Sequence, residues 1–360
     1  MPTKSSKLIG LSRRQILKAG AAGASWAAMA PGIIGSARAA DENVLYVNTW
    51  GGIWTQNERK YFYEPFTAAT GIAVRTVEPV SLSKLKAQVQ SGSYEFDVTS
   101  LSSMEFHQAA DENLVEPLDF SVLDKSKLWP GATVRDRGLQ GVSLGTILIY
   151  NKKKFPNGGP KSWADFWDVK KFPGARSLQN EPSRALAFAL LADGVPMDKL
   201  YPLDIDRAFK KLNEIKPHIK VWWTQGAQSE QLMKDGEVDM MSIWNSRTRP
   251  ILDAGIQLEL VWNQMQVDLG PWCVTRGTPR KKAAFQFLNF AIDAKHQADF
   301  CNAMYYGPSN PAANALMKPE VVELSPTSPE HLKLGFATDS QWLSPLFPKI
   351  KERWQEWLTS

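Results

Sequence analysis

The stretch VLYVNTWGGIWTQNERKYFYEPFTAATGIAVRTV, residues 44–77, contains the alternation that decides the fold. Val44 to Val47 is a short apolar run that predicts a strand, Asn57 to Thr70 has helical spacing, and Ile72 to Val77 is a β-branched run that predicts a second strand. Gly71 stands where a helix C-terminus often takes a left-handed residue. A strand, a helix and a strand in this order are typical of an α/β unit with parallel pairing.

The same alternation continues along the chain. Phe96 to Thr99 begins a third predicted strand, and Ile147 to Tyr150 precedes a second set of helices and strands that runs to Trp262. Five prolines predict that 307–330 is a looped crossing rather than the interior of an element. About 320 residues follow the first 39, which is more than one hydrophobic core usually supports. The sequence therefore predicts two α/β domains.

The first 39 residues have the order of an export signal. Arg13 and Arg14 lie in a basic region, a weakly apolar run follows from Ala19 to Ile34, and Ala37-Arg38-Ala39 matches a cleavage site. The paired arginines resemble a twin-arginine signal, which is read by the machinery that exports folded proteins. The alternative is an amphipathic helix of a cytoplasmic protein. We expect residues 1–39 to be a twin-arginine-type signal peptide and the protein to reach the periplasm.

Removal of this segment changes the charge of the protein. The full sequence has 42 basic and 37 acidic side chains, and residues 1–39 contain six of the basic ones and none of the acidic ones. The remaining 36 basic against 37 acidic side chains give a net charge near −1. A basic surface for nucleic acid is therefore not expected. No later stretch approaches the ~20 apolar residues of a membrane span.

Residue types that enzymes use are present, but without the spacing that their chemistry needs. None of the four histidines lies three or four positions from another histidine or a cysteine, and no glycine-rich nucleotide motif or G-x-S-x-G occurs. The sequence predicts no catalytic residue, no metal site and no cofactor. Cys273 and Cys301 could form one disulfide or remain two buried thiols, and the sequence leaves both possibilities open.

Tryptophan is frequent, and several copies fall at the ends of predicted strands. These are Trp50, Trp54, Trp244 and Trp272. In open α/β sheets, ligands bind beyond the carboxyl ends of the strands, and an indole face there can hold an organic cation. The glycines at 51 and 52 let backbone and rings approach a ligand closely. The sequence therefore predicts a pocket with aromatic walls.

Short motifs along the chain carry a resemblance to a known family. They include FDVTSLSS from Phe96, SWADFW from Ser162, GEVDMMSIWN from Gly236 and YGPSN from Tyr306. In order and spacing they resemble the spermidine/putrescine (polyamine) group of periplasmic solute-binding proteins of ABC importers, over nearly all of the chain after the signal. The resemblance implies a two-lobed type II α/β fold, in which each lobe is a mixed, mostly parallel sheet flanked by helices, and hinge crossovers join the lobes. Lobe 1 is expected at 40–147 plus about 271–315, and lobe 2 at 148–270 plus about 316–360.

The resemblance also implies binding positions. Trp50 matches the aromatic residue after the first strand, Ser102 or Ser103 the serine after the third, and Trp244 the tryptophan of the I-W-N motif that Asn245 completes. Glu181 lies in the region of the second-lobe carboxylates, Asp268 lies where a tryptophan and an acid precede the return crossing, and Trp342 lies near a late aromatic position. The tryptophan-acid motif before the crossing is not reproduced here, because Asp268 stands alone and is followed by Gly270, Pro271 and Trp272, the tryptophan already named at a strand end.

Departures from the family pattern concern charge. Gly51 and Gly52 replace an acid expected after Trp50, Arg184 stands where a second acid is expected, and Arg247 adds a cation at a strand end. One acid, an aromatic cage and arginines suit a zwitterion better than a polyamine. An arginine would take a carboxylate or phosphonate, while Glu181 or Asp268 would take the amine. The alternative for both arginines is a salt bridge on the protein surface.

We therefore expect a monomeric periplasmic receptor without enzymatic activity. It would close its two lobes on a small amine or zwitterion and deliver that ligand to the transmembrane subunits of an ABC permease. An exported enzyme and the receptor subunit of a sensory system are the alternative functions. The ligand stays open among a polyamine, an amino acid derivative such as γ-aminobutyrate, an aminophosphonate and a quaternary ammonium compound.

Overall fold

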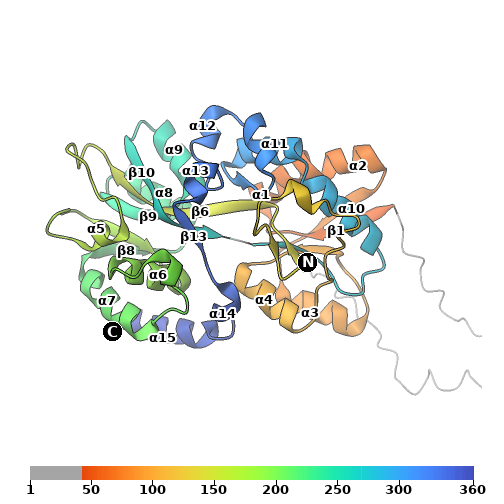
Figure 1. Ribbon diagram of the computed structural model, residues 1–360, viewed down its shortest axis with the longest axis horizontal. Helices are drawn as coiled ribbons and strands as arrows, with labels where there is room; N and C mark the ends of the chain where they lie inside the picture. Colours follow the sequence, from red (N-terminus) through yellow and green to blue (C-terminus); the bar gives the residue numbers. More distant parts are fainter. Residues whose placement is uncertain (1–42, 269) are drawn as a thin grey trace, which may run out of the picture. The chain divides into compact units, whose positions relative to one another are not determined.

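The computed structural model describes residues 43–268 and 270–360. The predicted signal peptide lies outside the described residues. Two mixed sheets form the framework, and each has helices packed on both faces (Figure 1).

The first sheet has the strand order β2-β1-β3-β11-β5-β4. β1 pairs in parallel with β2 and β3, whereas β11 is antiparallel to β3 and β5, and β4 is antiparallel to β5. Parallel pairs are thus the minority in this sheet. Its strands are β1 (Val44–Asn48), β2 (Ala73–Val77), β3 (Val98–Ser100), β4 (Thr133–Val134), β5 (Gly138–Leu139) and β11 (Trp272–Val274).

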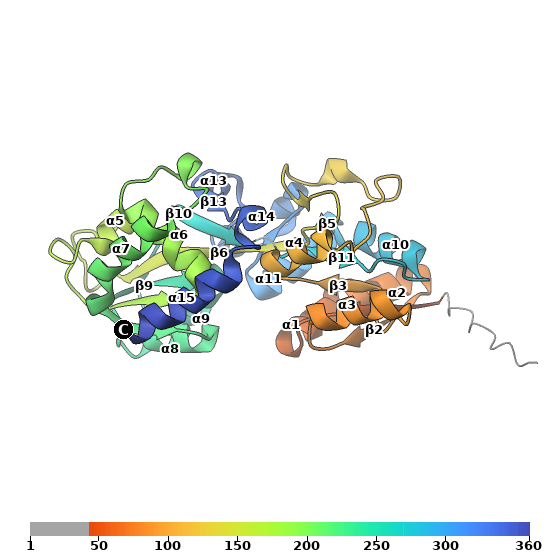
Figure 2. The ribbon, with the colours of Figure 1, turned by 90° about the horizontal axis from the view of Figure 1, so that it is seen from below.

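Alternating side chains of the first sheet enter two hydrophobic cores. Leu45 and Val47 of β1 pack in one core with helices α10 and α11, while Tyr46 packs in the other with α3 and α4. Successive residues of a strand point to opposite faces, which explains this division. Figure 2 shows α3 and α4 beside β3. The helices are α1 (Gly52–Glu58), α2 (Glu64–Thr70), α3 (Leu82–Ser91), α4 (Ser103–Asp111), α10 (Lys281–Ala291) and α11 (Ala294–Met304), with a π-helical segment (Arg59–Tyr63) between α1 and α2.

The second sheet has the strand order β13-β10-β6-β9-β7-β8, and β12 pairs with the start of β6. β10 and β9 are antiparallel to β6, and the remaining pairs on this path are parallel. The strands are β6 (Val142–Asn151), β7 (Arg176–Gln179), β8 (Ile219–Trp223), β9 (Met240–Trp244), β10 (Leu258–Asp268), β12 (Gly307–Pro308) and β13 (Gly335–Ala337).

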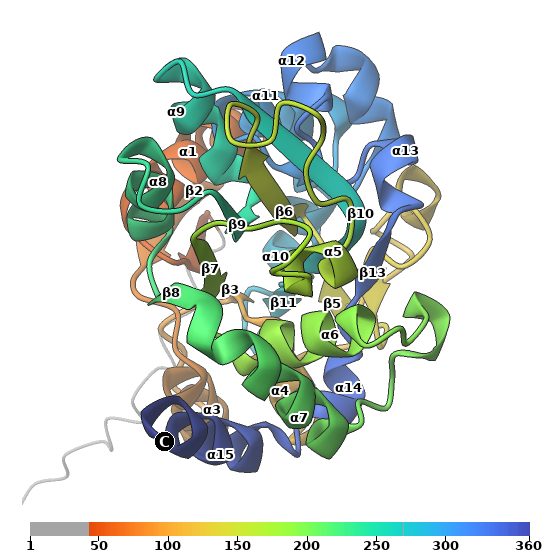
Figure 3. The same ribbon diagram turned by 90° about the vertical axis from the view of Figure 1, so that its left-hand side faces the viewer.

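β6 also divides its side chains between two cores. Leu148 and Tyr150 pack with α5, α6, α7 and α15, whereas Ile147 and Ile149 pack in the core that includes side chains of α8 and α9. Figure 3 shows α6 and α7 on one side of this sheet and α8 and α9 on the other. The helices are α5 (Trp163–Trp167), α6 (Pro182–Ala192), α7 (Ile205–Ile215), α8 (Gly226–Lys234), α9 (Thr248–Asp253), α12 (Pro319–Val322), α13 (Pro329–Leu332), α14 (Ser340–Leu343) and α15 (Phe347–Thr359).

Three segments connect the two sheets. Only Gln140 and Gly141 separate β5 from β6, a short link separates β10 from β11, and the segment after α11 leads to β13. The last of these segments was expected to be a loop, but it contains α12, α13 and a 3-10 segment at Pro311–Leu316. Each begins with a proline in its first turn, a position where the missing N–H of proline costs nothing. The lobe boundaries given by residue number stay a prediction.

Candidate functional site

The first wall of the site is the turn after β1. Thr49 is buried, Trp50 is 46% exposed, and α1 begins immediately afterwards. Gly51 and Gly52 have φ angles of +94° and +60°, which few residues with a side chain adopt. A Cβ on Gly51 would also lie 2.9 Å from a carboxylate oxygen of Glu78. The two glycines therefore allow the tight turn that presents Trp50.

An aromatic pocket of about 550 Å³ follows this turn, and we call it the inner compartment. This volume lies in the range of sites that hold small organic ligands. Its rings come from the turn after β1, from α1, β9 and β11, and from the segment after α11; they are Trp50, Trp54, Trp244, Trp272 and Tyr306.

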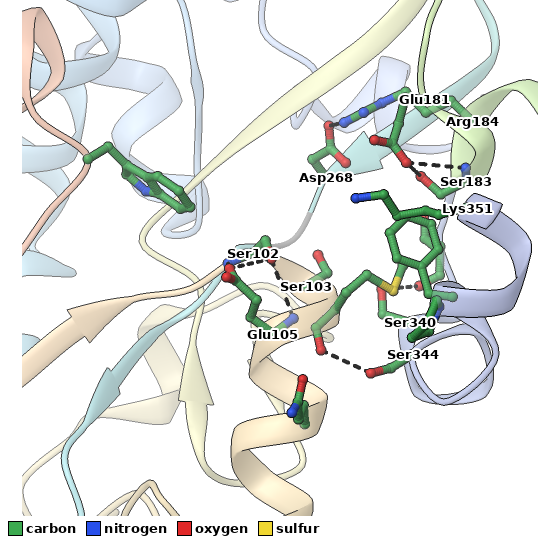
Figure 4. A pocket seen from close by; sticks show the side chains of 16 residues that line it. Ser102, Ser103, Glu105, Glu181, Ser183, Arg184, Asp268, Ser340, Ser344 and Lys351 are labelled. Carbon is green, nitrogen blue, oxygen red and sulfur yellow. Dashed lines mark hydrogen bonds and ion pairs between the residues drawn. The ribbon is translucent and has the colours of Figure 1, made fainter. Parts of the chain in front are cut away.

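A second pocket of about 460 Å³, the outer compartment, shares four lining residues with the inner one. The shared residues are Trp50, Ser102, Arg184 and Asp268. The outer compartment is polar: its other members include Glu105 of α4, Glu181 beside α6, and Lys351, which extends from α15 into the pocket (Figure 4). The site thus has an aromatic part and a polar part that meet at one boundary.

An ion pair lies at that boundary. The Arg184 guanidinium contacts the Asp268 carboxylate (Figure 4). Its Nε donates to Thr146 Oγ1 at 3.0 Å. The two charged side chains are 14% and 28% exposed, so both are partly desolvated and both remain reachable. Opposite charges side by side offer a recognition surface for a molecule that itself carries both charges.

Two carboxylates of the outer compartment, Glu181 and Glu105, form hydrogen bonds with serines that are close to them in the sequence. Glu181 caps α6 and accepts from the Ser183 hydroxyl at 2.9 Å. Ser102 and Glu105 form a capping box at the start of α4, in which the Ser102 hydroxyl lies 2.7 Å from Glu105 Oε2. These contacts order the helix termini that border the pocket.

The structure brings together eight of the thirteen residues predicted from the sequence. The inner or outer compartment is lined by Trp50, Ser102, Ser103, Glu181, Arg184, Trp244, Asp268 and Trp272.

The other five predicted residues do not line either compartment. Gly51 and Gly52 shape the turn, and Asn245 is buried among backbone groups. Arg247 lies 3.6 Å from Glu230 in an ion pair, and Trp342 packs against Tyr201. Their assignment as ligand contacts stays a prediction.

Several lining residues were not among the predicted contacts. The sequence marked Trp54 as an aromatic residue near a strand end. It lies on helix α1, and its side chain lines the inner compartment. Tyr306 lies beyond α11, and burial raises its pKa to about 12, so that it is a neutral phenol. Lys351 follows the last strand by fourteen residues, and no local pattern distinguishes it from other lysines of an amphipathic helix.

No group of three or more metal-ligating side chains occurs within residues 43–268 and 270–360. Cys273 and Cys301 are both buried and free, and burial raises the pKa of each thiol. Over the same residues, no helix is long and apolar enough to span a membrane.

Two mixed sheets are linked by three chain segments, elements of both sheets line an aromatic pocket, and an ion pair lies at the edge of that pocket. These features define a ligand-binding protein of the periplasmic binding protein type. Residues 62–327 match the family described as bacterial extracellular solute-binding protein. The chain belongs to this family.

Similar proteins agree with this assignment. The γ-aminobutyric acid-binding protein of Pseudomonas aeruginosa is 33% identical over 329 residues, which cover 89% of this chain and 93% of the relative. The spermidine/putrescine-binding periplasmic protein of Escherichia coli is 24% identical over 299 residues, or 79% and 83% of the two chains. A solved ABC transporter substrate-binding protein from Bradyrhizobium japonicum has a TM-score of 0.79 at 38% identity, covering 88% of this chain and 99% of that one. The type II binding-protein fold with two mixed α/β sheets and the solute-binding role predicted from the sequence are confirmed, and the relatives are binding proteins rather than enzymes. The expected excess of parallel pairs does not hold for the first sheet, because β11, which returns from the second sheet, runs antiparallel to both of its neighbours.

Proposed function

We propose that this protein is the periplasmic receptor of an ABC importer for a small zwitterion that carries one ammonium and one carboxylate, such as γ-aminobutyrate. The receptor would bind this ligand in the inner compartment and present it to the permease. A ligand that contacts elements of both sheets would favour the closed state, because it gains contacts there that the open state lacks.

The observation that carries the ligand class is the Arg184–Asp268 pair at the edge of the aromatic pocket. The planar guanidinium matches a carboxylate, and Asp268 together with the indole faces matches an ammonium. A polyamine would need an acid for each cationic group, because an unpaired buried charge is costly. Asp268 is the only acidic side chain among the lining residues of the inner compartment in the described chain, and it already faces an arginine. The name of the Pseudomonas aeruginosa relative supports the same ligand class.

A thermal-shift screen tests the ligand class. The mature protein is heated with γ-aminobutyrate, with butyrate and butylamine as single-charge analogues, and with putrescine and spermidine. A ligand that binds only the folded form raises the melting temperature by mass action. We expect the zwitterion to give the largest shift. A larger shift with putrescine or spermidine would contradict the zwitterion assignment and favour a polyamine receptor.

Variants of two arginines locate the carboxylate site. Arg184→Met removes the partner of the ligand carboxylate and leaves Asp268 unpaired, so we expect the affinity for γ-aminobutyrate to fall at least about 100-fold, or ~3 kcal/mol. Arg135→Met is the matched control, because Arg135 pairs with Asp111 at 2.6 Å and neither residue lines either compartment. Calorimetric titration of both variants measures the difference. Equal effects of the two substitutions would exclude Arg184 as the carboxylate partner.

Export through the twin-arginine machinery is part of the proposal and rests on Arg13 and Arg14. Replacement of both by lysine should leave the precursor in the cytoplasm, as measured by cell fractionation, while unchanged export would indicate another route.

A further inference from the structure

A buried carboxylate lies behind the aromatic wall of the inner compartment. Glu58, on α1, has no exposed surface. Its Oε2 accepts from the hydroxyl of Thr49, and from the hydroxyl of Tyr63 at 2.7 Å. The other oxygen, Oε1, is buried and has no hydrogen bond of regular geometry in the described chain. The Glu58 side chain does not cap a helix, and it does not connect the two sheets. A structural role of this kind therefore does not explain why a carboxylate is buried here.

The carboxylate adjoins two walls of the pocket. Trp54 lies one helical turn before it on α1, and the buried Nε1–H of Trp54, like Glu58 Oε1, has no hydrogen bond of regular geometry in the described chain. Trp272 lies on β11, and the indole N–H groups of both tryptophans lower the pKa of Glu58. The same two indoles line the inner compartment. Thr49 also contacts Thr55, whose hydroxyl accepts from the Gly51 N–H at 3.0 Å. Glu58 is thus joined to the turn that presents Trp50 and to two rings of the pocket.

No basic side chain in the described part of the chain is paired with this carboxylate. Burial is the main cause that raises the pKa of Glu58 to about 7, against hydrogen bonds from Thr49 and Tyr63 that lower it. The neighbouring groups do not titrate near neutral pH. Burial and the nearby Glu58 raise the pKa of Tyr63, and burial raises the pKa of Cys301 on the adjacent helix α11 and of Tyr306. Arg59, the next residue, acts electrostatically on Tyr63.

We propose that Glu58 is a specificity-determining residue that favours the ammonium group of the ligand from behind the indoles of Trp54 and Trp272. This inference rests on the proposed function. The ammonium does not touch Glu58; it lies against the pocket side of the rings, while the carboxylate lies on the protein side. An indole N–H that faces an anion makes the opposite parts of the ring more electron-rich, which strengthens cation–π attraction.

The arrangement couples ligand binding to a proton. When the ammonium binds, the ionised form of Glu58 gains a nearby opposite charge, and the neutral form does not. The O–H bond of the protonated carboxyl therefore breaks on binding, and the proton passes to solvent. Affinity for a cation-bearing ligand should rise with pH between pH 6 and 8. A one-unit decrease of the Glu58 pKa on binding corresponds to about a tenfold gain in affinity.

Isothermal titration of the mature protein tests this coupling. The probes are γ-aminobutyrate, β-alanine and 5-aminovalerate, each titrated at pH 6.0, 6.5 and 8.0 in two buffers of different ionisation enthalpy. We expect release of a measurable fraction of a proton per bound zwitterion at pH 6.5, and an affinity up to about tenfold higher at pH 8.0 than at pH 6.0.

Glu58→Gln should abolish both the proton release and the pH dependence, and should weaken binding mainly at pH 8.0. Glu64→Gln on the exposed part of α2 is the matched control and should behave like the unchanged protein. A residue with only a structural role would change the affinity equally at both pH values. If Glu58→Gln does not fold, proton release by the unchanged protein still decides the outcome.

The outcomes separate the two proposals. Binding without proton release and without pH dependence would overturn the role of Glu58 and leave the proposed function intact. If none of the three zwitterions binds, the proposed function fails, and the role of Glu58 fails with it.

Discussion

Arg176 shows how a charged side chain can serve structure without an ion partner in contact. It is 1% exposed, and its guanidinium donates to the carbonyl oxygens of Phe166 at 2.9 Å, Gly174 at 2.7 Å and Phe172. Burial lowers the pKa of this guanidinium. The contacts connect α5 and the loop after it to the first residue of β7.

Arg176→Met should therefore destabilise the protein strongly. Three buried carbonyl groups would lose their donors, and we expect a loss of about 3 to 5 kcal/mol in the free energy of unfolding. Urea denaturation measures this loss. Arg353→Met on the exposed face of α15 is the control, with an expected change below about 1 kcal/mol. A small effect at Arg176 would mean that water can replace the guanidinium.

Glu58 also makes stability depend on pH. Its pKa is 4.5 in a solvated chain and about 7 in the folded protein, so between these values the folded protein holds a proton that the unfolded chain has lost. The stability contributed by this group is therefore full below pH ~4.5, decreases as pH rises, and is lost above pH ~7, a change of about 3 kcal/mol at most. Urea denaturation at pH 5 and pH 8 should show a smaller decrease in Glu58→Gln than in the unchanged protein. The same decrease in both would show that Glu58 is ionised throughout.

The short segment after β9 joins elements that are distant in the sequence. The Asn245 side chain accepts from the Gly145 N–H of β6 at 2.9 Å and donates to the carbonyls of Tyr305 at 2.8 Å and Leu324 at 2.7 Å. It is fully buried. The family motif placed this residue beside a ligand-binding tryptophan, but its amide is fully used in holding β6, the end of α11 and the segment after α12 together.

Asn245→Ala should lower the free energy of unfolding by about 2 to 4 kcal/mol, because one buried N–H and two buried carbonyls lose their partners. Denaturation curves compare it with Asn57→Ala, in which an exposed hydrogen bond to Ile53 is lost. We expect the control to change stability by less than about 1 kcal/mol. Similar losses in both variants would argue against a linking role for Asn245.

The two cysteines lie in different hydrophobic cores of the first sheet. Cys273 packs with α3 and α4 in one core of the first sheet. Cys301 packs in the other core, with α10 and the π-helical segment that follows α1. Both thiols are free, and the sheet lies between these cores. No disulfide therefore joins the two faces of the first sheet.

Thiol labelling tests this arrangement. In native protein both thiols should react slowly with a chromogenic disulfide reagent, since they are fully buried and their pKa values are raised. In urea, without reductant, two thiols per chain should react at once. Fewer than two reactive thiols after unfolding would show that the protein had formed a disulfide, and fast labelling of the native protein would show that a core opens readily.

Local patterns predicted much of the architecture. The strands at 44–47 and 72–77, the helix at Ser183 to Leu191 and the final helix all lie within a few residues of the observed elements. Strands β7 and β8 were not predicted, because Leu178 is the single apolar residue of β7, Lys220 interrupts the apolar run of β8, and the partner strands lie far along the chain. The aromatic wall was predicted because large rings at strand ends are visible without knowledge of the fold.

Composition and periodicity were enough to predict the α/β class, the export signal and the aromatic walls of the pocket. These features depend on residues that are neighbours in the chain. Pairing between distant charges depended on the tertiary structure. Arg184 and Asp268 are 84 positions apart and meet only because α6 and the end of β10 border one pocket. Arg247 is equally basic and finds Glu230 instead. Burial likewise decided the protonation of Glu58, because a carboxyl group loses its charge only where the folded chain excludes water.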